Sequence, residues 1–171
     1  MTDIHNFTNV TDYLPILNSV IITDIFVIIL LLQGLIKSTV LQAWYRNLTL
    51  SAVIADVLII VLGIILTRFL YPYIFSKYTL LQFLLLAVLI QITHDVLFYI
   101  FTLAVPRGKS QILDIFKDYG KEKGFGAIIA DSLMMISSIL IATYLKGETL
   151  NSNIIILIFS IYLVPYMVYT V

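Results

Sequence analysis

Five long apolar runs, separated by short polar stretches, dominate the pattern of the chain. Each run has the roughly 20 residues that a helix needs to cross a hydrocarbon core of about 30 Å. The pattern predicts an all-α protein, an integral membrane bundle of five transmembrane helices that forms a single transmembrane domain over residues 1–171. The predicted helices cover residues 15–37, 47–71, 79–105, 125–145 and 151–171.

The polar stretch between the third and fourth runs has a periodicity of its own. Ser110 is a good helix N-cap, and the apolar residues after it recur at i, i+3, i+4 and i+7. We therefore predict a short interfacial amphipathic helix over residues 110–121, with its apolar side turned to the lipid. The apolar face holds Ile112, Ile115, Phe116 and Tyr119, and the opposite face holds Asp114, Lys117, Asp118 and Lys121.

The composition supports a membrane protein and excludes several functions. The chain is 61% hydrophobic and 12% charged, with a mean hydropathy of +1.05, whereas a soluble domain carries about 25% charged residues. The absence of cysteine excludes disulfides, zinc–thiolate sites, iron–sulfur clusters and thiol nucleophiles. Motifs of serine hydrolases, zinc proteases, P-loop NTPases and potassium filters are also missing. We favour a non-enzymatic role, assign no catalytic residue and expect no cofactor.

Lysine and arginine are distributed unevenly between the two sides of the predicted bundle. Seven lie in the stretches after the first and third runs, and three lie on the other side. By the positive-inside rule, the N-terminus is outside or lumenal and the C-terminus is cytoplasmic. The expected partners are the lipid bilayer and the anionic headgroups of its cytoplasmic face, not nucleic acid, and homo-oligomer formation is left open. The candidate membrane-surface residues are Lys109, Lys117, Lys121 and Lys123.

Other residues near the ends of the runs have simple interpretations. We expect Arg68 to extend its guanidinium group from the second helix to the membrane surface. Aromatic residues at run ends are typical of the belts that membrane proteins place at the interface. The belt would contain Trp44, Tyr71, Tyr73 and Tyr78.

Aspartates interrupt four of the five apolar runs. Asp24, Asp56, Asp95 and Asp131 each fall in a different predicted helix, and His94 stands beside Asp95. Counted from the cytoplasmic ends of the runs, the four lie at heights of roughly 12–20 Å. An ionisable group at that depth is costly unless it faces another such group, water or a ligand. We therefore predict that the four carboxyl groups meet in one layer inside the bundle.

The third predicted helix gathers its polar residues on one face, because Gln91, His94, Asp95 and Thr102 follow helical spacing. Four carboxylates in one layer cannot all be ionised without a cation, so some of them hold protons, and His94 can become positively charged. The candidates for handling protons or ions are Asp24, Asp56, Gln91, His94, Asp95 and Asp131.

Three functions remain open for these residues. The first is proton or cation handling by a channel or transporter, with the aspartates as exchange sites and His94 as a shuttle. The second is a structural protein of a viral or organellar membrane, in which the aspartates only clasp helices together. The third is an intramembrane lipid-modifying enzyme with a metal at these residues. Metal binding stays undetermined, since bundle di-metal sites use Glu-x-x-His pairs and the predicted spans contain one histidine.

A short internal repeat is also visible. Residues 52–56 and 127–131 match in type at every position, and both segments belong to helices predicted to run from inside to outside. Two explanations stay open, namely a parallel duplication of a helix pair, as in some transporters, and the chance likeness of apolar helices.

Four stretches carry a family resemblance: QITHDVLFY at residues 91–99, PRG at 106–108, FKDYG at 116–120 and ADSLMM at 130–135. Together they resemble uncharacterised multi-pass membrane proteins of nucleocytoplasmic large DNA viruses. The resemblance implies a viral or host internal membrane as the location. It implies no catalytic residue, because that group has no assigned activity.

Overall fold

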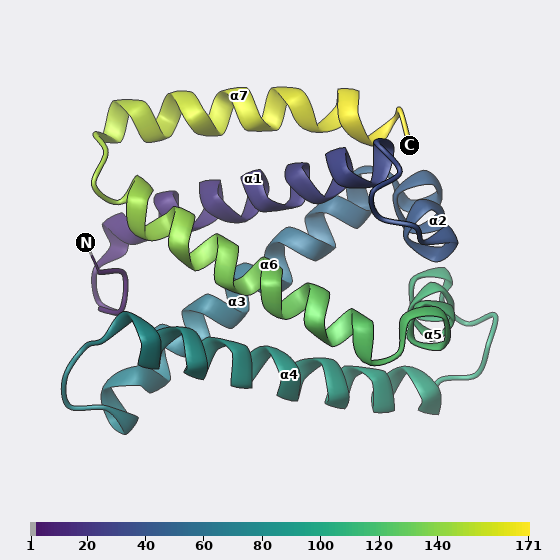
Figure 1. Ribbon diagram of the computed structural model, residues 1–171, viewed down its shortest axis with the longest axis horizontal. Coiled ribbons are helices and arrows are strands. Elements are labelled where there is room, and N and C mark those ends of the chain that lie inside the picture. Colours follow the sequence, from purple (N-terminus) through teal and green to yellow (C-terminus); the bar gives the residue numbers. More distant parts are fainter. Residues whose placement is uncertain (1–2) are drawn as a thin grey trace.

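The computed structural model describes residues 3–171, and within that range it contains helices and no strand. Five helices, α1, α3, α4, α6 and α7, are long and apolar enough to cross a membrane, which confirms the predicted fold class (Figure 1). In chain order the elements are η1 (Val10–Asp12), α1 (Tyr13–Leu32), α2 (Thr39–Leu48), α3 (Leu50–Ile74), α4 (Leu80–Ala104), α5 (Gln111–Lys123), α6 (Phe125–Leu145) and α7 (Leu150–Val168).

The boundaries around the first connection differ from the sequence prediction. Helix α1 ends at Leu32 rather than at residue 37, because the chain turns at Gly34 with a φ of 72°. Helix α3 begins at Leu50 rather than at residue 47, because the residues before it belong to a separate helix. The remaining predicted spans agree with α4, α6 and α7 to within three residues at each end.

That separate helix, α2, was not predicted. The Ser38 hydroxyl accepts a hydrogen bond from the Leu41 backbone N–H at 3.1 Å and so caps the first turn. Apolar residues then follow at i, i+3, i+4 and i+7, the same spacing that identified α5. These residues are Leu41, Trp44, Tyr45 and Leu48.

Helix α5 forms where predicted, but its apolar face packs on protein. Its Phe116 ring lies 4.9 Å from the Trp44 ring of α2 and 4.9 Å from the Phe98 ring of α4, centroid to centroid. At its C-terminal end, Glu122 accepts a hydrogen bond from the Val40 backbone N–H at 3.0 Å. A carboxylate at that place also interacts favourably with the N-terminal dipole of α2. The two short helices therefore hold each other at one end of the bundle.

The first six helices form two halves with the same order of elements. Each half has a long helix, a six-residue connection, a serine-capped short helix, one hinge residue and a second long helix. The hinge residues adopt nearly the same conformation, since Thr49 has φ 50° and ψ −124° and Gly124 has φ 52° and ψ −125°. Helices α1 and α4, the first of each half, both pack against α3 and α6. The structural repeat therefore extends well beyond the five matched residue pairs found in the sequence.

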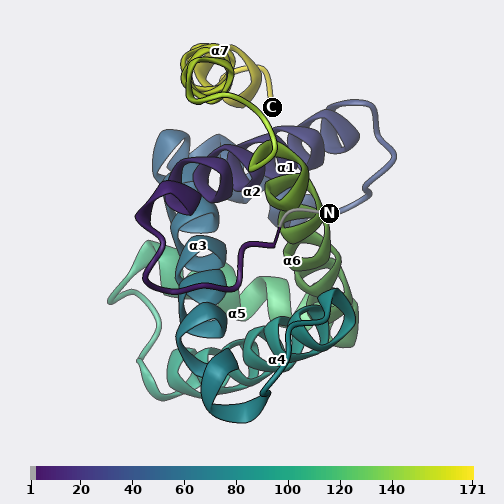
Figure 2. The same ribbon diagram turned by 90° about the vertical axis from the view of Figure 1, so that its left-hand side faces the viewer.

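The long helices extend between the two ends of the bundle in Figure 1, with α2 and α5 together at one end and residues 3–12 at the other. We call these the short-helix end and the N-terminal end. Helix α7 follows the two halves in the chain and lies beside α1 at the edge of the bundle, as Figure 2 shows most clearly.

Close approaches and polar contacts connect the spanning helices. A Cβ on Gly63 of α3 would lie 2.7 Å from Met135 Cε of α6, so the missing side chain lets the two helices approach. Ser138 of α6 donates to Thr23 of α1 at 3.1 Å. The Asn18 amide of α1 donates to the backbone carbonyl of α7 residue 153 at 2.8 Å. Hydrogen bonds between buried side chains of different helices fix how each helix is rotated relative to its neighbour.

The hinge conformation generates a stability prediction. Gly124→Ala should lower the free energy of unfolding in detergent by about 1–3 kcal/mol, because a side chain is strained at this positive φ. Gly126→Ala is the matched control, since Gly126 also has open space around a would-be Cβ but has no positive φ. Equal melting temperatures for the two variants would contradict the assigned hinge.

Candidate functional site

The four predicted aspartates lie at a similar depth, which we call the acid layer. Asp24 and Asp56 belong to α1 and α3 of the first half, and Asp95 and Asp131 belong to α4 and α6 of the second. Each stands six to nine residues from the helix terminus at the short-helix end, or about 9–14 Å along the helix axis. The roles assigned to these residues stay predictions, and their surroundings differ between the halves.

In the first half, α2 supplies a donor to each carboxylate. The Tyr45 hydroxyl donates to Asp24 Oδ1 at 2.8 Å, and the Trp44 indole N–H donates to Asp56 Oδ2 at 2.8 Å. Because these donors are consecutive residues, a single turn of α2 binds the acids of two spanning helices. Asp24 is fully buried, and its Oδ2 has no hydrogen-bond partner within residues 3–171.

The Tyr45 hydroxyl remains a neutral donor. Burial raises the pKa of Tyr45 well above its ordinary value, and the Asp56 and Asp24 carboxylates raise it further. Tyr45 therefore keeps its proton at neutral pH and can donate it to Asp24. Since Trp44 is also neutral, the first half offers its two acids hydrogen bonds without a positive charge.

In the second half, the donors to Asp95 come from its own helix. The Gln91 amide donates to Asp95 Oδ1 at 2.7 Å, and His94 Nδ1 lies 3.2 Å from the same oxygen. The His94 ring stacks on Phe98 with centroids 5.6 Å apart. Asp95 Oδ2 and Ser132 Oγ are both buried without a partner in the described part of the chain. This half therefore combines a partly exposed histidine with polar atoms whose hydrogen bonding is incomplete.

Asp131 is linked to its neighbours by charge. It interacts electrostatically with Asp95 and with His94, while Asp56 interacts with both Asp24 and Asp131. These interactions connect the acids of the two halves. In residues 3–171, no three side chains of the histidine, aspartate and glutamate types come together as a group that could hold a metal ion.

Helix α5 does not offer the donors that α2 offers. Counted back from each hinge, Trp44 corresponds to Tyr119, and Tyr45 corresponds to Gly120. The Tyr99 ring fills the space beside Gly120, since a Cβ there would lie 2.4 Å from a ring carbon. Burial raises the pKa of Tyr119, and Asp131 and then Asp56 add to the increase, which places Tyr119 near the acid layer.

The lysines predicted at the membrane surface do not behave alike. Lys109 and Lys121 are exposed, and the Lys123 ammonium donates to the Lys37 carbonyl at 2.6 Å. Lys117 departs from the expectation because it is buried and donates to the Val105 carbonyl at 2.5 Å. Val105 follows the last residue of α4, so Lys117 caps that helix rather than facing headgroups.

Arg68 also departs from the expected contact with the membrane surface. Its side chain is fully buried, and its Nη2 lies 3.1 Å from Asp12 Oδ2 and 2.9 Å from the Asn9 carbonyl. Lys146 pairs with the same carboxylate at 3.0 Å, and its ammonium also donates to the Asp3 carbonyl. Residues 3–12 are therefore fastened across the N-terminal end by two cations that share one acid.

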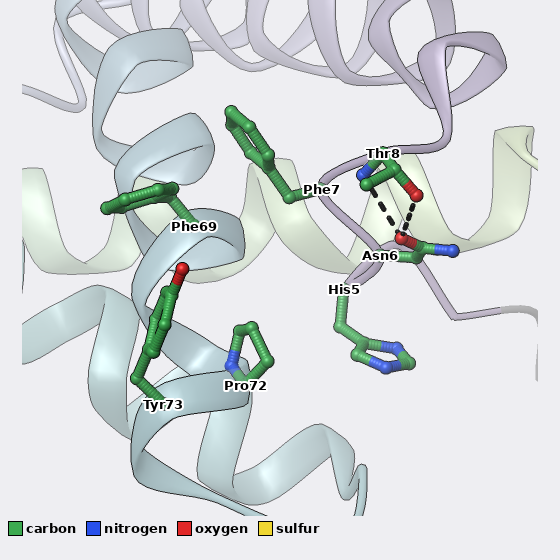
Figure 3. A pocket seen from close by; sticks show the side chains of 7 residues that line it. All are labelled: His5, Asn6, Phe7, Thr8, Phe69, Pro72 and Tyr73. Carbon is green, nitrogen blue, oxygen red and sulfur yellow. Dashed lines mark hydrogen bonds between the residues drawn. The ribbon is translucent and has the colours of Figure 1, made fainter.

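A shallow hollow lies beside this fastened segment (Figure 3). Its volume is about 320 Å³. The aromatic rings of Phe7, Phe69 and Tyr73 line it together with Pro72, and His5 borders it. The hollow is at the N-terminal end, so it does not open on the acid layer.

Comparisons with protein-family models, with curated proteins and with solved structures find no match to this chain. Helices of membrane-spanning type support a multi-pass membrane protein.

Sequence reasoning missed the residues that hold the acids. Trp44 was assigned to an aromatic belt, but its side chain is 4% exposed and bonds to Asp56. The signal was present, because a capping serine at residue 38 precedes an amphipathic pattern of ten residues. Pairing of Arg68 with Asp12 had no such signal, since it joins a spanning helix to a distant part of the chain.

Loss of the Tyr45 hydroxyl should destabilise the bundle. Tyr45→Phe leaves both oxygens of the buried Asp24 without a donor, so the free energy of unfolding should fall by about 1–3 kcal/mol. Thermal unfolding in detergent measures the change. Tyr73→Phe is the control because Tyr73 is 76% exposed. Equal stability of the two variants would show that the Asp24 contact contributes nothing.

The buried ion pair at the N-terminal end gives a second stability prediction. Arg68→Met leaves Asp12 paired with Lys146 and removes the donors to the Asn6 and Asn9 carbonyls, so the free energy of unfolding should fall by about 1–3 kcal/mol. Arg107→Met removes an exposed partner of Asp118 and should leave the melting temperature unchanged. If both variants melt together with the wild type, the structural importance assigned to the buried pair is wrong.

Proposed function

We propose that this chain handles protons or small cations inside the membrane, as a channel or transporter, and that the acid layer is where they bind. The proposed exchange sites are Asp24, Asp56, Asp95 and Asp131, with His94 as the proton shuttle and Gln91 as the donor that orients Asp95. The observation that carries the proposal is incomplete bonding, since Asp24 Oδ2 and Asp95 Oδ2 are both buried without a partner in residues 3–171.

Incomplete bonding of buried carboxylates calls for an explanation. A buried polar atom without a partner costs about 1–3 kcal/mol, and more when it is charged. Trp44, by contrast, satisfies one oxygen of Asp56. A bound proton, water or cation would supply the missing partner. The unpartnered oxygens therefore favour a site that exchanges something.

The arrangement of the halves supports the same proposal. Helices α1 and α4 run in one direction and α3 and α6 in the other, so both halves have the same orientation along the bundle (Figure 1). Some transporters have parallel repeats related by an axis along the membrane normal, with the bound ion near the repeat interface. Asp56 and Asp131, which interact across the halves, occupy such a place.

We also propose that the bundle is oriented in the membrane as its positive charges predict. The short-helix end carries Lys109 and Lys121, both exposed, and faces the cytoplasm. Anionic headgroups are the proposed partners of these two residues. A viral or host internal membrane is the proposed location.

A structural role is the second candidate, and one observation favours it. Trp44 and Tyr45 bind the acids of α1 and α3 at 2.8 Å each, which is how a helix clasp would be built. This role accounts for the two donors of the first half but leaves unexplained Asp24 Oδ2 and Asp95 Oδ2, which have no partner within residues 3–171. We therefore rank it second.

Ion flux through reconstituted protein tests the proposal. Liposomes containing the wild type should dissipate an imposed proton or monovalent-cation gradient faster than empty liposomes. Asp95→Asn and His94→Ala should slow that dissipation on the order of 100-fold, the low end for loss of a proton-transferring group. A dye inside the liposomes measures the rate.

Asp118→Asn provides the matched control, because Asp118 lies on α5 outside the acid layer and pairs with Arg107 at the surface. It should leave the flux unchanged. Wild-type liposomes that hold every gradient as well as empty ones, or variants that conduct as fast as the wild type, would refute proton or cation handling.

A further inference from the structure

We infer that Asp24 and Asp56 form a proton-binding site in which one proton is shared between the two carboxyl groups beneath the aromatic donors of α2. The inference rests on the proposed function in one respect, because it says which half of the acid layer retains a proton and which half exchanges it. The geometry of the pair itself is independent of any transport.

The groups that face this pair include no cation. From α2, Tyr45 and Trp44 donate as neutral groups. The other titratable groups near the pair are Asp131 of α6, which is itself an acid, and the phenol Tyr119 of α5. Within residues 3–171, neither carboxylate pairs with a lysine, arginine or histidine. Helix α7 also packs on α1, but its titratable side chains Tyr162 and Tyr166 are exposed.

Two neighbouring carboxylates without a cation cannot both be ionised at this depth. One proton on the pair removes the like-charge repulsion and leaves a single negative charge, which the phenol and indole donors stabilise. Two protons would place a second O–H group in a site that offers it no further acceptor. The pair is therefore expected to hold one proton at neutral pH.

The unpartnered atom provides the independent observation. Asp24 is fully buried, its Oδ1 is occupied by Tyr45, and its Oδ2 has no partner in the described residues. A proton on Oδ2, donated to the carboxylate of Asp56, would give Asp24 Oδ2 its missing partner. On release, the proton leaves the Asp24 oxygen and both carboxylates become negative, so release requires an acceptor nearby.

The other half can supply that acceptor. In α5 the position of Tyr45 is occupied by Gly120, with the Tyr99 ring packed beside it, so no phenol donates to the second pair from that position. Within residues 3–171, Asp131 accepts no hydrogen bond, and it interacts with both Asp56 and His94. The His94 side chain is 36% exposed, whereas Asp24 is buried. The first half therefore retains the proton, and Asp131 and His94 of the second half are the groups that can accept it.

The experiment uses Trp44, the one tryptophan of the chain. Its indole N–H donates to Asp56, so its fluorescence reports the ionisation of the pair. The full-length protein in lipid nanodiscs would be titrated with pH, with circular dichroism to confirm folding at each point. The wild type should show one transition in the folded range, because release of the shared proton creates a second negative charge beside the first.

Two variants should move this transition in opposite directions. Asp24→Asn removes the neighbouring charge, so the midpoint should fall by roughly 1 pH unit or more. Tyr45→Phe removes a donor that stabilises the ionised form, so the midpoint should rise. Asp118→Asn should leave it unchanged. No transition in the folded range, or an unmoved midpoint in Asp24→Asn, would overturn the shared proton. A change in Trp44 emission when sodium replaces choline at fixed pH would also overturn the shared proton, because the site would then bind an alkali cation.

The outcome is distinguishable from that of the flux measurement. If the midpoint moves as expected but no gradient is dissipated, the shared proton stands and the transport function fails. If the flux depends on Asp95 and His94 but the Trp44 transition does not respond to Asp24→Asn, transport stands and the shared proton fails.

Discussion

A carboxyl group inside an apolar bundle must receive hydrogen bonds or give up its charge, and this requirement shapes the short-helix end. Helix α2 meets it for α1 and α3, because Tyr45 and Trp44 reach Asp24 and Asp56 at 2.8 Å. Without α2, the buried carboxylate of Asp24 and the half-buried carboxylate of Asp56 would both lose their donors. The position of α2, its serine cap and its contact with α5 all serve to bring these two aromatic side chains to the acids.

The same constraint explains why the halves differ although their elements follow the same order. Thr49 and Gly124 adopt one conformation, so each half turns from its short helix into its second long helix in the same way. The side chains on the short helices then diverge, with Tyr45 in one half and Gly120 in the other. Asp95 receives its donor from Gln91 on its own helix instead. Two halves with one backbone plan therefore create two different environments for an acid.

The sequence predicted what depends on local pattern and missed what depends on distant contacts. Apolar length identified all five spanning helices, and helical spacing identified α5. Helix α2 was not predicted because its apolar residues adjoin the run that becomes α3. The helical spacing of those residues is nevertheless visible in the sequence. The burial of Arg68 and of Lys117 could not be read locally, since their partners Asp12 and Val105 lie 56 and 12 residues away in the chain.

The central claim is that Asp24 and Asp56 lie together beside consecutive donors of α2, and a double-mutant cycle tests it most directly. Asp24→Asn and Asp56→Asn, singly and combined, would be compared by thermal unfolding in detergent. The account predicts a coupling energy of at least about 0.5 kcal/mol, whereas Asp24→Asn combined with the distant Asp118→Asn should be additive. Additive effects for Asp24 and Asp56 would contradict the account.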